Sequence, residues 1–112
     1  MNRPLVELRE YLTADGHNPF RDWLTNLKDR QARAKIRVRL NRIRLGNFGD
    51  CKSVGQGVLE LRLTHGPGYR VYLGRKGQTV VILLYGGHKK NQSRDIKLAQ
   101  EYWADYLEKQ HE

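Results

Sequence analysis

Residues 57–90 read GVLELRLTHGPGYRVYLGRKGQTVVILLYGGHKK, and this stretch decides the fold. Apolar and polar residues alternate over 59–63 and again over 69–73, which is typical of strands with one buried face. The run 79–85 (TVVILLY) is apolar almost throughout, which favours a central strand covered on both faces. Between the last two strands, the glycine-containing segment 75–78 predicts a two-residue hairpin loop.

The register of the first two strands follows from their apolar positions. Aligning those positions places Arg62 opposite Arg70 and Glu60 opposite Tyr72. A one-residue slip would turn the leucines of 59–63 to water, so the pattern specifies the register strongly. Two directly opposed arginines repel each other. Either something negative lies between them, or Glu60 and solvent neutralise the pair, and the sequence leaves both interpretations open.

Length and charge narrow the class of protein. The chain has 112 residues, a net charge of +9 and one cysteine, Cys51. The length predicts one domain over 1–112, and the charge favours nucleic acid, an anionic membrane or an acidic protein as partner over a merely solubilising surface. A single cysteine excludes an internal disulfide and favours a reducing compartment. Because no signal peptide and no run of about 18 apolar residues is present, we expect a cytoplasmic protein with no membrane partner.

Two helices are predicted before the quoted stretch, and a strand within 5–12 precedes them. Asn18 can cap the first helix, and Pro19 suits its first position because the missing N–H costs nothing there. Apolar side chains that follow at helical spacing are expected in the core, namely Phe20, Trp23, Leu24 and Leu27. The second helix is expected over 29–45, with Gly46 just past its end. Since the two helices are close in sequence, an antiparallel helical hairpin is the simplest arrangement.

The second helix carries an unusual concentration of positive charge. Its apolar stripe consists of Ala32, Ile36, Leu40 and Ile43. Its other faces carry seven cations, namely Arg30, Arg33, Lys35, Arg37, Arg39, Arg42 and Arg44. A solvated helix face is the ordinary explanation of a charge run. Here the density of cations favours a polyanion or an acidic partner.

Two further segments complete the predicted elements. The glycine-rich segment 47–57 is expected to be a loop that contains a short strand over 51–54. The last segment is expected to be a helix, with Asn91 or Ser93 as its cap. Its apolar stripe is formed by Ile96, Ala99, Trp103 and Leu107. This stripe would cover an edge or one face of the sheet.

Several kinds of active site find no support in the sequence. The chain has no glycine-rich phosphate loop, and its four histidines and one cysteine show no zinc-binding spacing. Its carboxylates are too scattered for a two-metal nuclease, and no serine or cysteine triad is convincing. We therefore expect no metal and no cofactor. What remains is a cationic surface with an aromatic residue, made of Lys52, Arg62, Arg70, Tyr72, His88, Lys89 and Lys90.

A surface of this kind suits RNA. Arginine and lysine bind phosphate and stabilise the extra negative charge of a pentacoordinate phosphorane, and Tyr72 could stack on a base. A histidine such as His88, or a lysine, could accept the proton of the 2′-hydroxyl. Because RNA supplies this nucleophile, cleavage would need no metal and would leave a cyclic 2′,3′-phosphate. A non-catalytic RNA-binding protein would show the same residues.

The order of motifs resembles a known family. The pieces that carry the resemblance are GNFGDCKSVGQGVLELRLTHGPGYRVYL, the hydrophobic strand after it, and GGHKKNQSRDIKLAQEYW. They resemble the RelE/ParE superfamily of type II toxins and, within it, the HigB-like group of phage Gp49-like addiction module killer proteins. The resemblance covers about residues 18–107. It implies an α+β fold with two N-terminal helices packed on a twisted, mainly antiparallel sheet of 4–5 strands, plus a C-terminal helix.

The resemblance also implies roles for individual residues. Arg70 matches the sheet arginine of the RelE-type active site, and Lys89 or Lys90 matches the basic residue after the last strand. Lys52 lies where such toxins place cations before the strand meander. RelE-type enzymes carry a catalytic tyrosine in the C-terminal segment, but residues 92–100 contain none. The HigB-like members imply that His88 acts as the acid or base instead.

The resemblance implies a toxin neutralised by a cognate antitoxin, a small helix-turn-helix protein encoded next to it. Its first implied activity is cleavage of mRNA on the ribosome, which inhibits translation. A ParE-like inhibitor of DNA gyrase, which cleaves no nucleic acid, is the alternative. A basic nucleic-acid-binding module without toxicity is a third. The clustered cations favour the endoribonuclease, with the ribosome and mRNA as partners.

Overall fold

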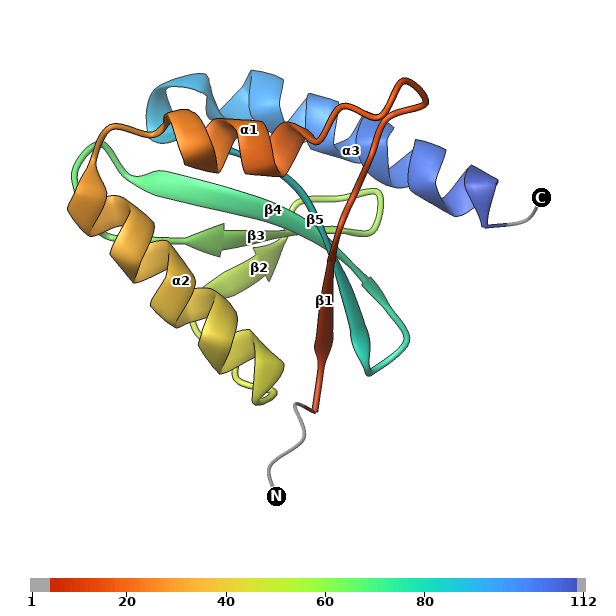
Figure 1. Cartoon of the computed structure of the whole chain (residues 1–112), viewed down its shortest axis with the longest axis horizontal. Coiled ribbons are helices and arrows are strands. Elements are labelled where there is room, and N and C mark those ends of the chain that lie inside the picture. Colours follow the sequence, from red (N-terminus) through yellow and green to blue (C-terminus); the bar gives the residue numbers. More distant parts are fainter. Residues whose placement is uncertain (1–4, 111–112) are drawn as a thin grey trace.

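The structure is a computed structural model that describes residues 5–110 (Figure 1). Its strands are β1 (Glu7–Glu10), β2 (Cys51–Ser53), β3 (Val58–Arg62), β4 (Tyr69–Lys76) and β5 (Val80–His88). Its helices are α1 (Pro19–Asn26), α2 (Arg30–Arg44), the short 3-10 helix η1 (Lys89–Asn91) and α3 (Gln92–Lys109). The predicted α+β class is confirmed.

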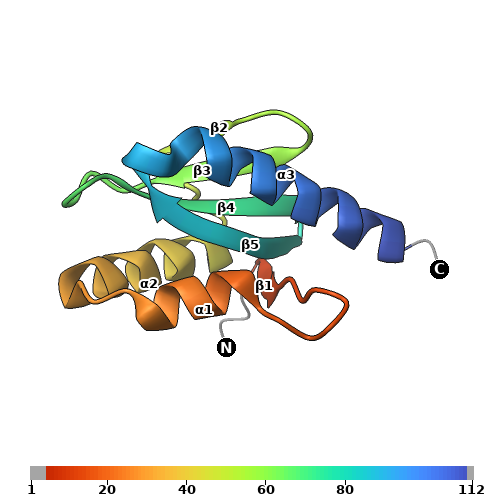
Figure 2. The same ribbon diagram turned by 90° about the horizontal axis from the view of Figure 1, so that it is seen from above.

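The strands form one mixed sheet in the order β1-β5-β4-β3-β2. The pairs β2–β3, β3–β4 and β4–β5 are antiparallel, whereas β1 runs parallel to β5. Helices α1 and α2 cover one face, and α3 crosses the other (Figures 1 and 2). Within residues 5–110, no helix is long and apolar enough to cross a membrane.

The predicted register of the meander is confirmed. Arg62 lies opposite Arg70, and Glu60 lies opposite Tyr72. The apolar positions of the two strands, such as Leu61 and Val71, turn toward α1 and α2, where they join the larger core cluster. The positions between them, which include Glu60 and Tyr72, turn toward α3. The two faces of β3 and β4 therefore pack against different helices.

Strand β5 is covered on both faces, as its apolar run predicts. Val81 and Leu83 pack on the side of α1 and α2, whereas Ile82 and Leu84 pack on the side of α3. The strand is longer than expected, however, since it continues through two glycines to His88. His88 therefore pairs with the first residue of β4 and does not lie where the chain leaves the sheet.

Two glycines near the end of β5 explain why helices approach the strand so closely there. A Cβ atom built on Gly86 would lie 2.1 Å from the ring of Trp23 in α1. A Cβ atom on Gly87 would lie 2.0 Å from the carboxylate of Asp95 in α3. Because glycine has no side chain, both groups pack directly on the strand backbone, and the ladder continues between them.

The turn between β4 and β5 differs from the prediction. Lys76 pairs with Val80, so residues 77–79 form a three-residue loop where two residues were expected. Gly77 has φ +64, a left-handed conformation that a glycine adopts at little cost. The carbonyl of Thr79 accepts a hydrogen bond from the backbone N–H of Glu7, the first residue of β1.

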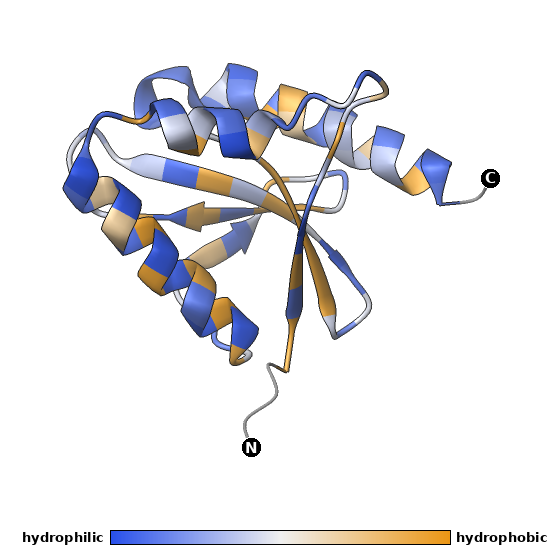
Figure 3. Ribbon diagram, in the orientation of Figure 1, coloured by the Kyte–Doolittle hydropathy of each residue, from blue (hydrophilic) through white to orange (hydrophobic). Residues whose placement is uncertain are grey.

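The N-terminal helices begin where the capping residues predict. The side chain of Asn18 accepts a hydrogen bond from the backbone N–H of Arg21, and Pro19 begins α1. The four stripe residues of α2 are all buried, and polar residues alternate with them around the helix (Figure 3). The expected antiparallel helical hairpin is wrong, because α1 and α2 diverge from the turn between them (Figure 1).

Helix α3 buries Ala99 and Trp103 against the sheet. A Cβ atom on Gly74 of β4 would lie 2.2 Å from the Trp103 ring, so the indole rests on strand backbone. Leu107, the last residue of the predicted stripe, is 37% exposed because the helix extends past the sheet. Asn91 occupies the cap position but makes no side-chain capping hydrogen bond.

Candidate functional site

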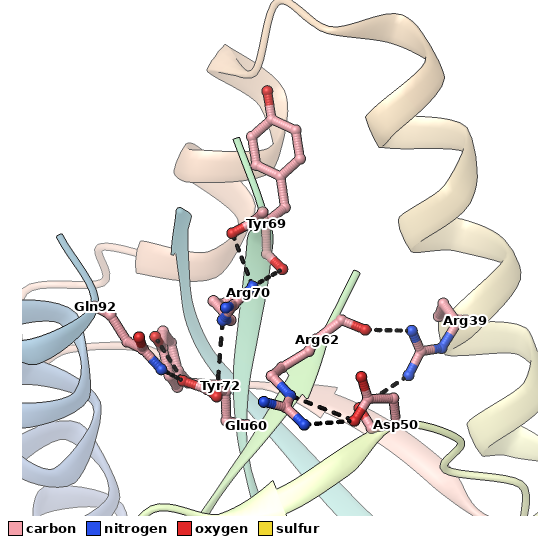
Figure 4. Close-up of polar contacts among 9 residues, drawn as sticks. Arg39, Asp50, Glu60, Arg62, Tyr69, Arg70, Tyr72 and Gln92 are labelled. Atoms are coloured by element: carbon pink, nitrogen blue, oxygen red, sulfur yellow. Dashed lines mark hydrogen bonds and ion pairs between the residues drawn. The ribbon is translucent and has the colours of Figure 1, made fainter. Parts of the chain in front are cut away.

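Arg70 is the centre of the candidate site (Figure 4). It lies on β4 between Arg62 of β3 and Gly87 of β5, on the face covered by α3. Only 9% of the residue is exposed, and its Nε lies 3.7 Å from Oε1 of Glu60. Its Nη1 donates to the carbonyl oxygens of Gly68 and Tyr69, at 3.0 and 3.3 Å. The guanidinium is therefore held by one carboxylate and two backbone carbonyls.

Glu60 is fully buried and is itself held in place. Its Oε2 accepts a hydrogen bond from the hydroxyl of Tyr72, at 3.2 Å, and one from the side-chain amide of Gln92, at 2.8 Å. Burial and the neighbouring Glu60 carboxylate raise the pKa of Tyr72. Helix α3 thus closes over this part of the sheet through Gln92, its first residue.

The structure contradicts the predicted role of Tyr72. Its side chain is fully buried, and its hydroxyl is bonded to Glu60. A ring with no exposed face cannot stack on a base. Strand alternation places Tyr72 on the same face as Arg70, as predicted, but helix α3 covers that part of the face. Tyr72 therefore packs beneath α3 and donates a hydrogen bond to Glu60.

Arg62 has a different acidic partner from Arg70. Its guanidinium contacts the carboxylate of Asp50 at 3.1 Å, and both side chains are partly exposed. The guanidinium of Arg39 in α2 donates to the carbonyl oxygens of Arg62 and Asp50, at 2.6 and 3.2 Å, which ties the helix to this edge (Figure 4). Each of the opposed arginines thus has a carboxylate of its own. Glu60 neutralises Arg70 as one interpretation expected, and Asp50 supplies the other charge.

Lys89 lies beside Arg70 because both bind the same carbonyl group. The backbone N–H of Lys89 donates to Gly68 at 2.9 Å, and Nη1 of Arg70 donates to the same oxygen at 3.0 Å. A Cβ atom on Gly68 would lie 3.2 Å from Arg70 Nη1 and 3.4 Å from Lys89 Cβ. The side chains of Lys89 and Lys90 are exposed in η1. Lys52 is also exposed, opposite Glu60 at the edge of the sheet.

His88 does not share the face of Arg70. It pairs with Tyr69, whose ring packs on the side of α1 and α2, so the register turns His88 to that side. His88 was expected in the same region as Arg70, and it directly precedes Lys89 at the end of β5, although its side chain is on the other face of the strand from Arg70. His88 stands at the end of the strand, close enough to Asp95 for its charge to act on that carboxyl group.

Asp95 is a buried acid that the sequence did not single out. It is 2% exposed and packs on Gly87, and burial raises the pKa of its carboxyl group. The Nε atom of Arg94 lies 3.5 Å from Oδ1 of Asp95, and its positive charge lowers the pKa of that carboxyl group. Together with Asp95 Oδ1, three more buried polar atoms lack a hydrogen-bond partner within residues 5–110, namely Glu60 Oε1, Arg70 Nε and His88 Nδ1.

Three of these four residues lie at the C-terminal end of β5: His88 is its last residue, Asp95 packs on Gly87, and Arg70 pairs with Gly87, while Glu60 reaches Arg70 from β3. Buried polar groups are ordinarily hydrogen-bonded, so a group of buried polar atoms without hydrogen bonds makes this region a candidate functional site. The sequence offered one signal for it, because paired glycines inside an apolar strand indicate a close approach to the backbone. Within residues 5–110, no three His, Cys, Asp or Glu side chains gather so as to hold a metal ion.

Comparison with known proteins identifies the family. Residues 22–103 match the family described as phage derived protein Gp49-like (DUF891). The chain belongs to this Gp49-like family. It is 52% identical over 81 residues, which is 72% of this chain and 82% of the relative, to an uncharacterized protein of Haemophilus influenzae (strain ATCC 51907 / DSM 11121 / KW20 / Rd). No solved structure matches the chain.

The Gp49-like family is associated with toxin–antitoxin systems, which indicates a toxin-related protein with an antitoxin as partner. The matched segment of this Gp49-like chain contains the whole candidate site, from Lys52 to Asp95. It also contains α2 and most of α3. Both the cationic helix and the buried cluster are therefore parts of the family region.

Proposed function

We propose that this Gp49-like protein is the toxin of a type II toxin–antitoxin system and acts as a metal-independent, ribosome-dependent mRNA endonuclease of the RelE/ParE, HigB-like kind. The observation that carries the proposal is the convergence of Arg70 and Lys89 on the carbonyl of Gly68, next to the buried Glu60 carboxylate. A fixed guanidinium, next to a residue whose ammonium is free to reach a ligand, suits a phosphodiester that gains negative charge in its transition state.

In the proposed reaction, the 2′-oxygen of a nucleotide attacks the adjacent phosphorus. A P–O2′ bond forms and the P–O5′ bond breaks, which leaves a cyclic 2′,3′-phosphate and a 5′-hydroxyl end. Arg70 and Lys89 bind the phosphate oxygens, with Lys90 beside them. His88 accepts the proton of the 2′-hydroxyl from the end of β5, and a proton returns to the 5′-oxygen as it leaves.

Glu60 acts through Arg70 and not on the RNA. Its carboxylate is fully buried and accepts hydrogen bonds from Tyr72 and Gln92, so it is held beneath the guanidinium. A charged, hydrogen-bonded support of this kind holds an arginine in one geometry before substrate binds, and such preorganisation is a large part of electrostatic catalysis. Glu60 is therefore a positioning residue.

The exposed cations around this centre would bind the RNA backbone. Lys52 and Arg62 extend the site along the β2–β3 edge, and Lys89 and Lys90 extend it beyond β5. On the other face of the sheet, α2 presents a second set of exposed cations, namely Arg30, Lys35, Arg37, Arg42 and Arg44. Positive charge on both faces supports a large polyanionic target such as the ribosome and an acidic antitoxin segment as its competitor.

Induced expression tests the proposal. Translation should stop, and transcripts should be cut only where they are being translated. Lys89→Met, which removes an exposed charge, and the pair Arg70→Ala with Lys89→Ala should both abolish the cuts. Lys76→Ala is the matched control, because Lys76 is an exposed cation at the opposite end of β4.

The outcome separates the candidate activities. Growth arrest with intact mRNA and a DNA damage response would instead indicate a gyrase inhibitor. Unchanged growth, with a folded protein that still binds RNA, would indicate a non-toxic binding module. Toxicity that survives the Arg70 and Lys89 substitutions would refute the site assignment. We expect the cognate antitoxin to be a helix-turn-helix protein encoded beside the toxin, and both to act in the cytoplasm.

A further inference from the structure

A pocket lies beside the end of β5 at some distance from Arg70. Strand β1 pairs with β5 only as far as the Glu10–Leu83 pair, and the backbone N–H of Tyr11 makes one further bond to Leu83. Beyond that point, helices α1 and α3 flank the edge of β5 from its two faces (Figure 2). The pocket between them has a volume of about 390 Å³.

Aromatic rings form much of the pocket wall. Trp23 comes from α1, Tyr85 from β5 and Tyr102 from α3. The two tyrosine rings meet edge to face with centroids 6.1 Å apart, and the indole of Trp23 rests on Gly86. All three side chains are only partly buried. Rings contributed from both sides of the edge suit a flat apolar ligand.

The polar side chains of the pocket are a histidine, a carboxylate and an amide. They belong to His17, Asp22 and Asn26, and no lysine or arginine lines the pocket. His17 Nδ1 contacts Asp22 Oδ2 at 2.8 Å. The amide nitrogen of Asn26 donates to the backbone carbonyl of Asp22, and within residues 5–110 its side-chain oxygen accepts no hydrogen bond. The pocket therefore offers acceptors for N–H groups and no lysine or arginine for a phosphate.

These properties fit a nucleobase. The volume is in the range of small-ligand pockets, the aromatic walls suit a planar ring, and the free acceptors suit the exocyclic amino and ring N–H groups of a base. A phosphate would be repelled by Asp22. Tyr85 is three residues from His88, which corresponds to about 10 Å along an extended strand. A base in the pocket could thus belong to a nucleotide neighbouring the one at Arg70.

We infer that the pocket formed by Trp23, Tyr85, Tyr102 and Asn26 is a base-binding subsite that takes an RNA base next to the cleaved phosphodiester. Phosphates would bind the cations around Arg70, and a neighbouring base would bind the aromatic pocket, which no lysine or arginine lines. The subsite would set a nucleotide preference beside the cut. Binding of a base in the pocket does not depend on the proposed function, whereas its position next to a cleaved bond does.

The first experiment measures binding without any cleavage. The full-length protein is titrated with adenosine, guanosine, cytidine and uridine, which carry no phosphate for the cationic site. At least one should shift the NMR signals of the Trp23 indole and the Asn26 side-chain amide. The Trp103 indole, packed on Gly74 elsewhere on the sheet, is the internal control and should not move. Ribose 5-phosphate, which has no base, should leave the pocket signals unchanged.

The second experiment measures cleavage by Asn26→Ala and Tyr102→Leu. Loss of one stacked or hydrogen-bonded base contact should reduce the preference for the favoured nucleotide beside the cut about fivefold or more, while total cutting persists. Asn41→Ala, an exposed asparagine-to-alanine change in α2, should keep the wild-type preference. Asn26 is exposed, so its variant remains informative if Tyr102→Leu fails to fold.

The outcomes distinguish failure of the pocket from failure of the proposed function. If wild type cuts no RNA, the proposed activity fails and the nucleoside titration alone decides the pocket. If wild type cuts RNA but both variants keep its preference, or no nucleoside moves the Trp23 and Asn26 signals, the subsite is refuted. Shifts caused by arginine methyl ester and not by nucleosides would also refute it, since the pocket would then bind a cationic side chain of a partner.

Discussion

Replacing Arg70 by methionine would remove the guanidinium while keeping most of the aliphatic chain. The Glu60 carboxylate would then remain buried without its counter-charge, since it is 0% exposed and lies 3.7 Å from Arg70 Nε in the intact protein. Breaking a buried ion pair by removing one partner costs about 3–5 kcal/mol. Because Glu60 keeps its hydrogen bonds from Tyr72 and Gln92, we expect the lower end, about 3 kcal/mol.

Urea unfolding followed by circular dichroism measures this loss. With an m value of about 2 kcal/mol per molar, a loss of about 3 kcal/mol lowers the midpoint by about 1.5 M. Arg62→Met is the matched control, because Arg62 lies directly opposite Arg70 but pairs with Asp50 at the surface. That pair is partly exposed and should contribute about 1 kcal/mol or less.

A double variant tests whether the loss comes from the pair itself. Glu60→Gln removes the buried charge while keeping the shape of the side chain. Combined with Arg70→Met, it should cost clearly less than the sum of the two single changes, by about 1 kcal/mol or more. Additive losses, or a loss for Arg70→Met no larger than for Arg62→Met, would refute the view that Glu60 and Arg70 form a coupled buried pair.

Three further changes test the fold and the site. Burial raises the pKa of Asp95. Between about pH 4 and the raised pKa, the folded protein therefore keeps a proton that the unfolded chain has released, and the free energy of unfolding falls as the pH rises through this window. Asp95→Asn should therefore gain stability relative to wild type across that window, and urea midpoints that differ by a constant amount from pH 4 to 7 would contradict this. Gly86→Ala should lose about 1–3 kcal/mol by overpacking against Trp23, so an unchanged melting temperature would exclude the contact. Asn18→Ala should lower the free energy of unfolding in urea by about 1 kcal/mol, whereas Asn18→Ser should keep most of the wild-type stability because serine also caps helices. Equal losses for the two variants would show that the cap of α1 contributes nothing.

The sequence predicted those features that depend on neighbouring residues. The capping residue Asn18 and the stop at Gly46 placed the ends of the N-terminal helices, since caps act within one turn. The register of β3 and β4 was equally predictable, because a slip of one residue would expose a whole apolar face. Arg62 opposite Arg70 followed from that register alone.

Other features depended on contacts between distant segments. Alternation placed Tyr72 on the face of Arg70, but it could not show that Ala99 and Trp103 of α3 would pack on that part of the sheet and bury the ring. Nor could the pattern show that His88 would still pair with β4, since the apolar run ends before the two glycines that precede His88. The packing of Trp23 and Asp95 on those glycines keeps the strand extended.

By itself, then, the sequence determined the elements, the register of the meander and the concentration of positive charge, because each is set by local periodicity or by composition. Only the tertiary structure decided which polar groups are buried together. Glu60 and Asp95 are 35 residues apart in the chain, as the difference of their numbers shows, and α3 brings them to the same part of the sheet, where Glu60 pairs with Arg70 and Asp95 packs on Gly87 opposite Arg70. Burial depends on this long-range packing, and it gathers these polar side chains, which are ordinarily exposed, into the candidate site.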